Sequence, residues 1–219
     1  MTRGVRMVML GRQGAGKGTQ CVRLSRHYVV PHISTGDMLR AAVREGTELG
    51  LKAAELMAAG SLVPDDIMIG IVDDRLDCDD TTERGYILDG FPRTVDQAEA
   101  LADITAARPL DVVVDLDVAK EVVLERLAGR RVCSDCAANY SLDKPPRYGW
   151  VCDNCGGDVV QREDDTPAAI EKRLSDYETK TAPLIAWYRE RGLLEVVDGY
   201  GTADEVTARL LAAIDQRRR

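Results

Sequence analysis

Gly-Arg-Gln-Gly-Ala-Gly-Lys-Gly-Thr occupies residues 11–19 and directly follows an apolar run at residues 5–10. The apolar run is typical of a buried strand, so the glycine-rich stretch is expected to form the turn between that strand and a helix. Backbone N–H groups in such a turn point inward, and the helix N-terminus adds about half a positive charge beside a bound anion. With the full charge of Lys17, the stretch predicts a phosphate-binding loop.

The spacing of Gly11, Gly16 and Lys17 matches the Walker A pattern, but Gly18 stands where Ser or Thr is expected. The hydroxyl comes one place later, at Thr19. Because the hydroxyl after the lysine normally contacts Mg²⁺, its displacement points away from standard GTPases and ATPases and toward the nucleoside monophosphate kinases. A glycine-rich turn without a ligand is disfavoured, since so many glycines cost stability that only a close backbone approach would justify.

The composition narrows the class of protein. With 219 residues, 45% of them hydrophobic, the chain is expected to form one main domain with insertions. A net charge of -8 opposes a general role on nucleic acid or on a membrane surface. No stretch approaches 18 apolar residues, and the N-terminus runs into the first strand without a signal-peptide pattern, so a cytosolic location is expected.

Short apolar runs alternate with helical spacing along most of the chain. Runs at residues 5–10, 86–88, 112–116 and 193–197 predict strands of a parallel sheet buried on both faces, and a further short strand is expected at Val29 and Val30, ended by Pro31. Helical patterns occupy residues 17–27, 37–44, 48–59, 66–78, 95–106, 120–129 and a longer stretch after Thr166. The alternation predicts an α/β doubly wound fold. Residues 34–65 and 131–161 break it and are candidate insertions.

Cysteine spacing in the second candidate insertion predicts a metal site. Two Cys-x2-Cys pairs are separated by 15 residues, which suits a four-cysteine zinc ribbon, and they are Cys133, Cys136, Cys152 and Cys155. Iron suits the same sulfurs, but zinc is favoured because the segment needs a fold more than a redox centre. Four protein ligands leave no open position, so the ion is expected to be structural. Cys21 and Cys78 have no neighbouring Cys and are expected to be buried thiols in helices.

Acidic and basic residues supply the other elements of a phosphoryl-transfer site. Asp89 follows the run at residues 86–88, at a strand end where ligands bind, and suits Mg²⁺ or its waters. Asp115 is a competing candidate, but it lacks the Gly-Phe-Pro-Arg turn that follows Asp89 and is typical of an ordinary aspartate at a strand end. Arg126 and Arg130 lie four residues apart on an expected helix and should share a face. Arg130, Arg162 and Arg173 bracket the cysteine-bearing insertion, which favours phosphate binding by the set.

Two expected helix starts complete this pattern. Ser34 or Thr35 is expected to cap the helix that carries Arg40, and Thr166 with Pro167 to begin the helix that carries Arg173. Because the chain has only two histidines, the sequence offers little support for a mechanism based on histidine. An anionic acceptor phosphate requires no general base.

At this point the chain resembles the adenylate kinase family, in its form with a long, zinc-bearing lid, from residue 5 to about residue 211. The resemblance rests on residues 11–20, 34–40, 62–65, 89–93 with Gln97, 129–131, the four cysteines, Arg162 with Asp164 and Asp165, and Arg173. It implies Mg²⁺-dependent, reversible phosphoryl transfer from ATP to AMP, giving two ADP. It also implies a five-stranded parallel sheet flanked by helices, with a core at residues 1–33, 64–129 and 163–219, an AMP-binding helical insertion at 34–63 and a zinc-ribbon lid at 130–162 that closes over ATP.

The resemblance also implies residue roles. Catalytic roles fall to Lys17, Asp89, Arg93, Arg130, Arg162 and Arg173. The ATP site comprises Gly11, Gly14, Ala15, Gly16, Lys17, Gly18, Thr19, Arg126 against the adenine, Arg130 and Gly201. The AMP site comprises Thr35, Arg40, Val63, Gly90, Arg93, Gln97, Arg162 and Arg173, with a cis Phe91–Pro92 bond expected. Gln13 departs from the family, which often has proline there; the empty loop should be less preorganised, but activity should survive.

Several alternatives remain open. A kinase for CMP, UMP or GMP would share the loop and fold, and GTP would suit the donor site if Arg126 only stacks on the base. A zinc-ribbon ATPase acting on nucleic acid is a remote alternative, because its ribbon should be basic and this one is mixed in charge. ATP, AMP and ADP are the expected partners, no nucleic acid or membrane is expected, and a monomer is favoured.

Overall fold

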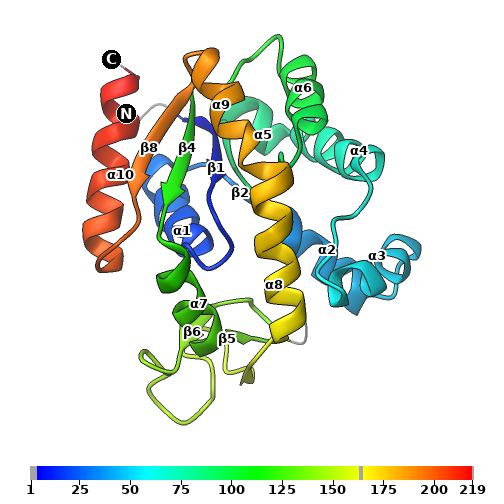
Figure 1. Cartoon of the computed structure of the whole chain (residues 1–219), viewed down its shortest axis with the longest axis vertical. Coiled ribbons are helices and arrows are strands. Elements are labelled where there is room, and N and C mark those ends of the chain that lie inside the picture. Colours follow the sequence, from blue (N-terminus) through cyan, green and yellow to red (C-terminus); the bar gives the residue numbers. More distant parts are fainter. Residues whose placement is uncertain (1–3, 163–164, 219) are drawn as a thin grey trace.

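The computed structural model describes residues 4–162 and 165–218, and its core is a five-stranded parallel sheet in the order β2-β3-β1-β4-β8 (Figure 1). The strands are β1 (Arg6–Leu10), β2 (His32–Ser34), β3 (Tyr86–Asp89), β4 (Val112–Asp117) and β8 (Leu194–Asp198). Met9 of β1 lies beside Asp89 of β3, and Leu10 beside Asp115 of β4. The carboxyl ends of the strands therefore meet at one edge, as the alternating pattern predicts.

Helices cover both faces of the sheet. They are α1 (Lys17–Tyr28), α2 (Thr35–Arg44), α3 (Glu48–Ala58), α4 (Asp65–Leu76), α5 (Asp79–Arg84), α6 (Val95–Ile104), α7 (Lys120–Gly129), α8 (Pro167–Asp176), α9 (Pro183–Glu190) and α10 (Ala203–Arg217), with a π-helical segment η1 (Tyr177–Thr181) between α8 and α9. Met7 and Met9 of β1 pack with α1, α7 and α10, whereas Val8 and Leu10 pack with α4, α6 and α9. This alternation gives each strand two buried faces, which explains its continuous apolar run.

Two segments leave the core, as the sequence pattern indicated. Helices α2 and α3 project to one side of the sheet, and the segment from β5 (Arg130–Cys133) through β6 (Asn139–Ser141) to β7 (Val159–Val160) projects below it (Figure 1). The latter forms an antiparallel sheet in the order β6-β5-β7. Helices α8 and α9 with η1 between them form a long rod, and α8 is its end nearest this small sheet (Figure 1).

The expected strand at Val29 and Val30 was wrong. Val29 has a φ of +56° and ends α1, its N–H donating to the Ser25 carbonyl oxygen, and the strand begins only after Pro31, at His32. A β-branched residue in the left-handed region has no local sequence signal, because the sheet beyond Pro31 sets where the chain must turn. Helix α5 was also missed: Cys78, expected within a helix and buried, instead precedes α5 and is exposed.

Helix starts mostly agree with the sequence. Ser34 accepts a hydrogen bond from the backbone N–H of Asp37 at 3.3 Å, so Ser34 and not Thr35 caps α2. Thr166 caps α8 and Pro167 occupies its first turn. These caps place Arg40 and Arg173 each within the first two turns of a helix, near the edge where the strands end.

Candidate active site

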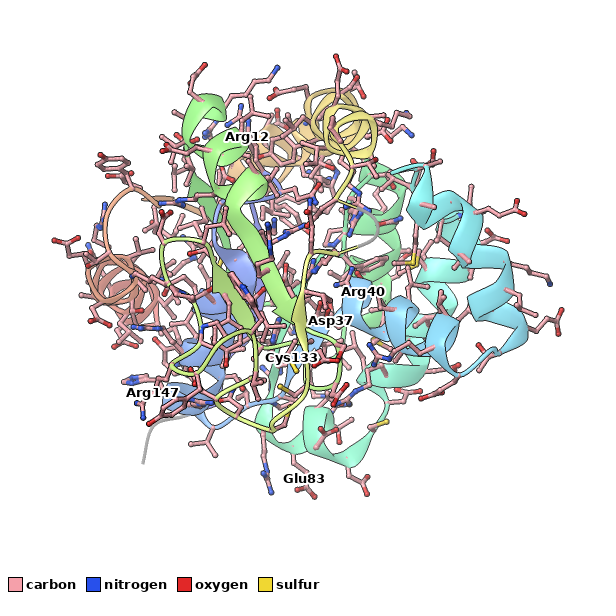
Figure 2. All side chains as sticks on the ribbon, turned by 90° about the horizontal axis from the view of Figure 1, so that it is seen from below. Arg12, Asp37, Arg40, Glu83, Cys133 and Arg147 are labelled. Carbon is pink, nitrogen blue, oxygen red and sulfur yellow. The ribbon has the colours of Figure 1, made fainter. Side chains whose placement is uncertain are left out.

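A cleft of about 500 Å³ opens where the carboxyl ends of the strands meet the two projecting segments. Its walls come from the loop before α1, the start of α2, the small sheet, α8 and η1. Seen from below, Asp37 and Arg40 of α2 lie near the middle of the molecule, whereas Glu83 and Arg147 lie at its margin (Figure 2). The cleft therefore joins parts of the chain that are far apart in sequence.

The loop at residues 11–19 needs its glycines. Gly11, Gly14 and Gly16 have φ values of +134°, +85° and +102°, which side chains rarely adopt. A Cβ on Gly14 would also lie 2.8 Å from the Leu127 side chain, and one on Gly11 would lie 2.6 Å from the Leu116 carbonyl oxygen. Close packing on the sheet and α7 therefore excludes larger residues, and the loop backbone stays open toward the cleft.

Lys17 folds back over this loop. Its Nζ donates to the carbonyl oxygens of Gly11 at 2.7 Å and Arg12 at 3.0 Å. Burial lowers the pKa of Lys17, and neighbouring Asp89 only partly offsets that effect. Since the ammonium is held by neutral carbonyls, it is a buried positive charge suited to an anion entering the loop.

Asp89 ends β3 within reach of Lys17 and His32. Its Oδ2 lies 3.4 Å from His32 Nε2. Burial acts to raise the pKa of Asp89, but His32 and Lys17 outweigh it and the pKa is lowered. Cys21 of α1 is buried beside them, as expected for a lone thiol in a helix, and possible metal-ligand atoms of Cys21, His32 and Asp89 lie within 4.8 Å of one another. No sequence signal joined His32 to this group, because only the sheet brings β2 beside β3.

Asp115, the competing candidate, lies deeper in the sheet. It is 5% exposed, and its Oδ1 has no hydrogen-bond partner among the described residues. Burial and Asp117 raise the pKa of Asp115. Asp115 does not line the cleft formed by the described residues, whereas Asp89 does.

The turn after β3 brings Arg93 to the floor of the cleft. The Phe91–Pro92 bond is cis, as expected from the resemblance. Arg93 Nε donates to the Gly90 carbonyl oxygen at 2.7 Å, and burial lowers the pKa of Arg93, with Arg173 and Arg40 adding to the effect and Asp89 opposing it. A buried arginine beside two like charges lacks full compensation from the protein alone.

A small pocket of about 60 Å³ extends from the cleft beneath α2. Its lining includes six of the eight residues expected at an AMP site, namely Thr35, Arg40, Val63, Gly90, Arg93 and Gln97. The other two, Arg162 and Arg173, line the adjoining cleft. Apolar side chains, among them Leu39 and Met68, complete the small pocket, as a flat aromatic base would require.

Gln97 is held in one orientation at the base of this pocket. Its Oε1 accepts from the Arg93 backbone N–H at 2.7 Å, and its Nε2 donates to Asp65 Oδ1 at 2.7 Å. A backbone N–H only donates and an ionised carboxylate only accepts, so the amide cannot be reversed. One N–H and one lone pair of the Gln97 amide remain for a ligand. Asp65 also accepts from Thr94 Oγ1 at 2.7 Å, a partnership that no sequence signal indicated.

The arginines around the lid base converge on one carboxylate. Asp165 is buried, and Arg130 Nε donates to its Oδ2 at 2.7 Å, with a second bond from Arg130 Nη2 to Oδ1. Arg173 Nη1 lies 3.7 Å from the same Oδ1. Asp165 therefore chiefly holds Arg130. Asp164 lies outside the described residues.

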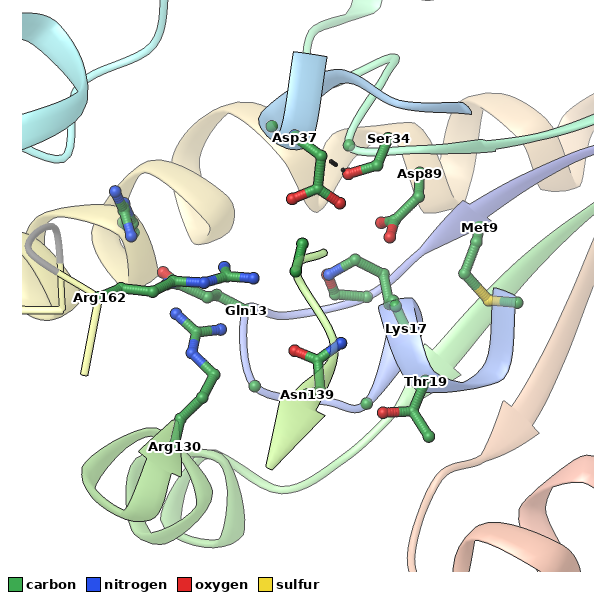
Figure 3. Close-up of a pocket in the computed structure, with 18 of the residues that line it drawn as sticks. Met9, Gln13, Lys17, Thr19, Ser34, Asp37, Asp89, Arg130, Asn139 and Arg162 are labelled. Atoms are coloured by element: carbon green, nitrogen blue, oxygen red, sulfur yellow. Dashed lines mark hydrogen bonds between the residues drawn. The ribbon is translucent and has the colours of Figure 1, made fainter. Parts of the chain in front are cut away.

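Arg162 is the least compensated of these cations. Its Nε has no hydrogen-bond partner among the described residues. Burial lowers the pKa of Arg162 to about 10, and Arg130 and Arg40 add to the effect. Figure 3 shows Arg162 and Arg130 on one side of the pocket and Lys17 and Asp89 on the other, with Gln13 between.

The expectation that Arg126 and Arg130 share a helix face was wrong. Helix α7 ends at Gly129, and Arg130 has an extended backbone that begins β5. Arg126 instead lies against the phosphate loop, where its Nη1 donates to the Ala15 carbonyl oxygen at 3.0 Å and its Nη2 to the Gly199 carbonyl oxygen at 3.3 Å. The pairing of β5 with β6 and β7 ends the helix, and that pairing is not local in sequence.

The remaining expected ATP-site residues divide into two groups. Gly11, Gly14, Gly16, Gly18 and Thr19 line the cleft together with Lys17, Arg126 and Arg130. Ala15 and Gly201 do not line the cleft formed by the described residues. Gly201 has a φ of +115° in the loop before α10, close to the Gly199 carbonyl that holds Arg126.

The four predicted cysteines come together in the small sheet. Their sulfurs lie within 4.8 Å of one another, with Cys133 and Cys155 Sγ atoms 3.4 Å apart and those of Cys136 and Cys152 3.5 Å apart. Tetrahedral zinc at about 2.3 Å from each sulfur requires sulfur separations of about 3.8 Å, so this donor set fits the ion. Such an ion would supply structural cross-linking only, because all four ligands are protein thiolates.

Matching turns shape the two cysteine pairs. The N–H of Ala137 donates to the Cys133 carbonyl oxygen at 3.2 Å, and that of Gly156 donates to the Cys152 carbonyl oxygen at 2.9 Å. Ala137 and Gly156 both have positive φ values, +58° and +79°. The Asn154 N–H also lies 3.4 Å from Cys152 Sγ and donates to it, which favours a thiolate at a metal site.

Comparison with known proteins places this geometry in context. The profile of the adenylate kinase family matches residues 9–193. An adenylate kinase of Geobacter sp. (strain M21) is 51% identical over 211 residues, covering 95% of this chain and 98% of the relative. Adenylate kinases of Citrifermentans bemidjiense and Methanococcoides burtonii are 50% and 47% identical, covering 95% and 96% of this chain and 98% of each relative. In the described residues, no helix combines the length and apolar character that a membrane span requires.

Proposed function

Because this chain belongs to the adenylate kinase family, we propose that its cleft transfers a phosphoryl group reversibly from ATP to AMP, giving two ADP. The chain is a phosphotransferase with nucleoside monophosphate kinase activity. We further propose which nucleotide bases the chain accepts, what its individual residues do, and which metal ions it holds.

The observation that carries this proposal is a concentration of positive charge. Seven cationic side chains line one cleft in a chain of net charge -8, and they are Lys17, Arg40, Arg93, Arg126, Arg130, Arg162 and Arg173. The pKa values of Lys17, Arg93 and Arg162 are lowered, chiefly because these half-buried cations are partly removed from water. Phosphoryl transfer needs such a set, because its transition state spreads charge over oxygens that cations stabilise.

The roles follow from where each cation lies. The loop backbone and Lys17 would hold the ATP phosphates, with Arg126 fixed by two carbonyls beside the adenine. Arg130, Arg162 and Arg173 would neutralise the phosphoryl group between the nucleotides. Arg40 and Arg93 would hold the AMP phosphate next to the pocket beneath α2. Asp89 suits an Mg²⁺ ion or its waters, and that ion would neutralise the ATP phosphates.

The fixed amide of Gln97 supports AMP as the acceptor. Its free N–H and its free lone pair can pair with an acceptor nitrogen and the exocyclic amino group of adenine. Guanine would present the opposite order of donor and acceptor, which a reversible amide would tolerate but this one cannot. CMP, UMP or GMP as acceptor, or GTP as donor, remains the alternative.

The two projecting segments would exclude water from the reaction. We assign residues 34–63 to an AMP-binding insertion and 130–162 to a lid over ATP, leaving 1–33, 64–129 and 163–219 as the core. Closure around both nucleotides would direct the phosphoryl group to AMP and not to solvent. A structural Zn²⁺ in the four-cysteine site would support the lid, and iron is the alternative ion.

The cellular setting is also part of the proposal. A cytoplasmic monomer without nucleic-acid or membrane partners agrees with the acidic net charge. A nucleic-acid-binding zinc ribbon remains the remote alternative. Absence of any retardation of single-stranded or double-stranded probes at low salt would exclude it.

The central test is Lys17→Ala in a coupled assay of ADP release. We expect kcat/KM for ATP and AMP to fall by at least about 100-fold, since a buried charge on the transferred phosphates is lost. Lys52→Ala is the matched control, because Lys52 is exposed on α3 and pairs only with Glu48 among the described residues. Near wild-type turnover in Lys17→Ala would refute the assignment. A panel of nucleoside monophosphate acceptors and nucleoside triphosphate donors in the same assay identifies the base that each site accepts.

A further inference from the structure

The side chain of Gln13 points from the loop at residues 11–19 toward the arginines at the base of the lid (Figure 3). It follows Arg12 in the loop between β1 and α1 and lines the cleft. With its amide oxygen turned toward the arginines, Oε1 accepts from Arg173 Nη1 at 2.9 Å and from Arg130 Nη2 at 3.0 Å. In the reverse orientation Nε2 would donate to Asp165 Oδ1 at 3.4 Å but would also face two guanidinium donors, so the two shorter hydrogen bonds favour the first orientation.

This amide oxygen connects three parts of the chain. Gln13 belongs to the loop, Arg130 to the base of the lid and Arg173 to α8. Both arginines also contact the buried Asp165, Arg130 through Nε at 2.7 Å and Arg173 through Nη1 at 3.7 Å. The partial negative charge of the Gln13 oxygen lies between the facing nitrogens of the two guanidinium groups.

A proline at this position would offer no such acceptor. Its ring ends in carbon atoms, so the loop would lack a side-chain hydrogen bond to either arginine. Gln13 therefore does more than free the loop backbone at that position. It holds two guanidinium groups in fixed orientations beside the glycine-rich loop. Because the Gln13 oxygen is neutral, its hydrogen bonds can be replaced when a more negative phosphate oxygen enters the cleft.

We propose that Gln13 is a positioning residue for phosphoryl transfer, holding Arg130 and Arg173 over the phosphate loop before the nucleotides bind. This inference rests on the roles proposed above for Arg130 and Arg173. Preorganised cations avoid reorganisation during the reaction, so the benefit falls on kcat more than on KM.

The test compares Gln13→Met with Gln161→Met. Methionine keeps an unbranched side chain but lacks the carbonyl oxygen. Gln161 is the matched control because its Nε2 donates to the backbone oxygen of the same Asp165, at 3.3 Å. We expect Gln13→Met to lower kcat about tenfold with each KM within about twofold, as loss of a charge-assisted hydrogen bond implies, and Gln161→Met to leave both unchanged.

A charged variant and a second background sharpen the test. Gln13→Glu places a full negative charge against the arginines and near the phosphates, so the KM for ATP should rise about tenfold or more. In an Arg173→Lys background the effect of Gln13→Met should shrink to about threefold, because one of its two partners is replaced while Arg130 remains. These ratios are measured at a temperature below the thermal transition of every variant.

The outcomes separate this inference from the proposed function. An equal tenfold loss in both backgrounds would mean that Gln13 acts on the loop alone, and no loss in either would mean that it positions nothing; each result overturns the inference. If Arg173→Lys lowers kcat while Gln13→Met does not, the site assignment stands without Gln13. If Arg173→Lys is itself silent, the assigned role of Arg173 fails and the inference fails with it.

Discussion

The lid and the helical insertion flank the same cleft but are stabilised by different forces. In the lid, the buried cluster comprises only Cys133, Cys152 and Val159 among the described residues. In the helical insertion, Leu39, Ala53 and Val63 join a large apolar cluster that continues through the core to Leu184 and Tyr188. The lid has little apolar packing of its own and would depend on the proposed metal cross-link, whereas the insertion packs against the rest of the protein.

Because the two segments are packed differently, they should differ in how they can move without unfolding. A metal ion held by the four cysteines would give the lid a rigid interior, and the proposed closure would then move the lid as a unit about its two connections. The insertion shares apolar contacts with the core, so its movement must slide or break part of that packing. The two segments should therefore respond in opposite ways to metal removal and to core mutations.

Disrupting the metal site should have the largest effect. Cys136→Ala, or removal of zinc with a chelator, deletes a contribution of roughly 10 kcal/mol of apparent metal-binding energy that the small apolar cluster cannot replace. We expect rapid proteolysis within residues 130–162 and a strong loss of kcat, with little change in the thermal transition of the core. Cys78→Ala, which removes an exposed lone thiol, is the control. If the lid stayed resistant to protease without metal, the conclusion that metal binding stabilises the lid would be wrong.

Truncating the apolar face of the insertion should have the next largest effect. Leu39 is 7% exposed, and Leu39→Ala should destabilise the protein by about 2–5 kcal/mol and raise the KM for AMP. Leu51→Ala on α3, where the side chain is 68% exposed, should change stability by less than about 0.5 kcal/mol. Chemical denaturation measures both. Addition of chelator should leave the difference between the two variants unchanged; a chelator-dependent difference would show that the segments are not independent.

Removing a single helix cap should have the smallest effect. Thr47 Oγ1 accepts from the Gly50 N–H at 3.0 Å at the start of α3. Thr47→Ala should therefore cost about 1 kcal/mol, read as a small fall in the thermal transition. Thr179→Ala is matched to it, because the Thr179 hydroxyl only donates to the Ser175 carbonyl oxygen within a helical segment. Equal losses in the two variants would mean that the cap contributes nothing specific.

Much of this architecture could be predicted from local patterns. The glycine spacing predicted the loop before α1, paired cysteines predicted the metal site, and apolar runs predicted four of the strands of the main sheet. Each of these signals lies within a short window of sequence, where spacing and chemistry restrict the backbone strongly. The family resemblance added the number of strands, five, and the cis Phe91–Pro92 bond.

The failures share a cause. Val29 ends α1 in a left-handed conformation because β2 must pair with β3. Arg130 leaves α7 because β5 pairs with β6 and β7, and it then meets Asp165, 35 residues away in sequence. Local propensity carries no information about such distant partners.

The sequence alone predicted the glycine-rich loop after the first strand, the cluster of four cysteines and the alternating α/β core, because these depend on spacing within a few residues. Only the tertiary structure decided which charges meet. Asp165 with Arg130, Gln97 with Asp65, and Gln13 with Arg130 and Arg173 join residues 32 to 160 positions apart. Electrostatic and hydrogen-bond energies depend on distances in space, and folding alone sets those distances.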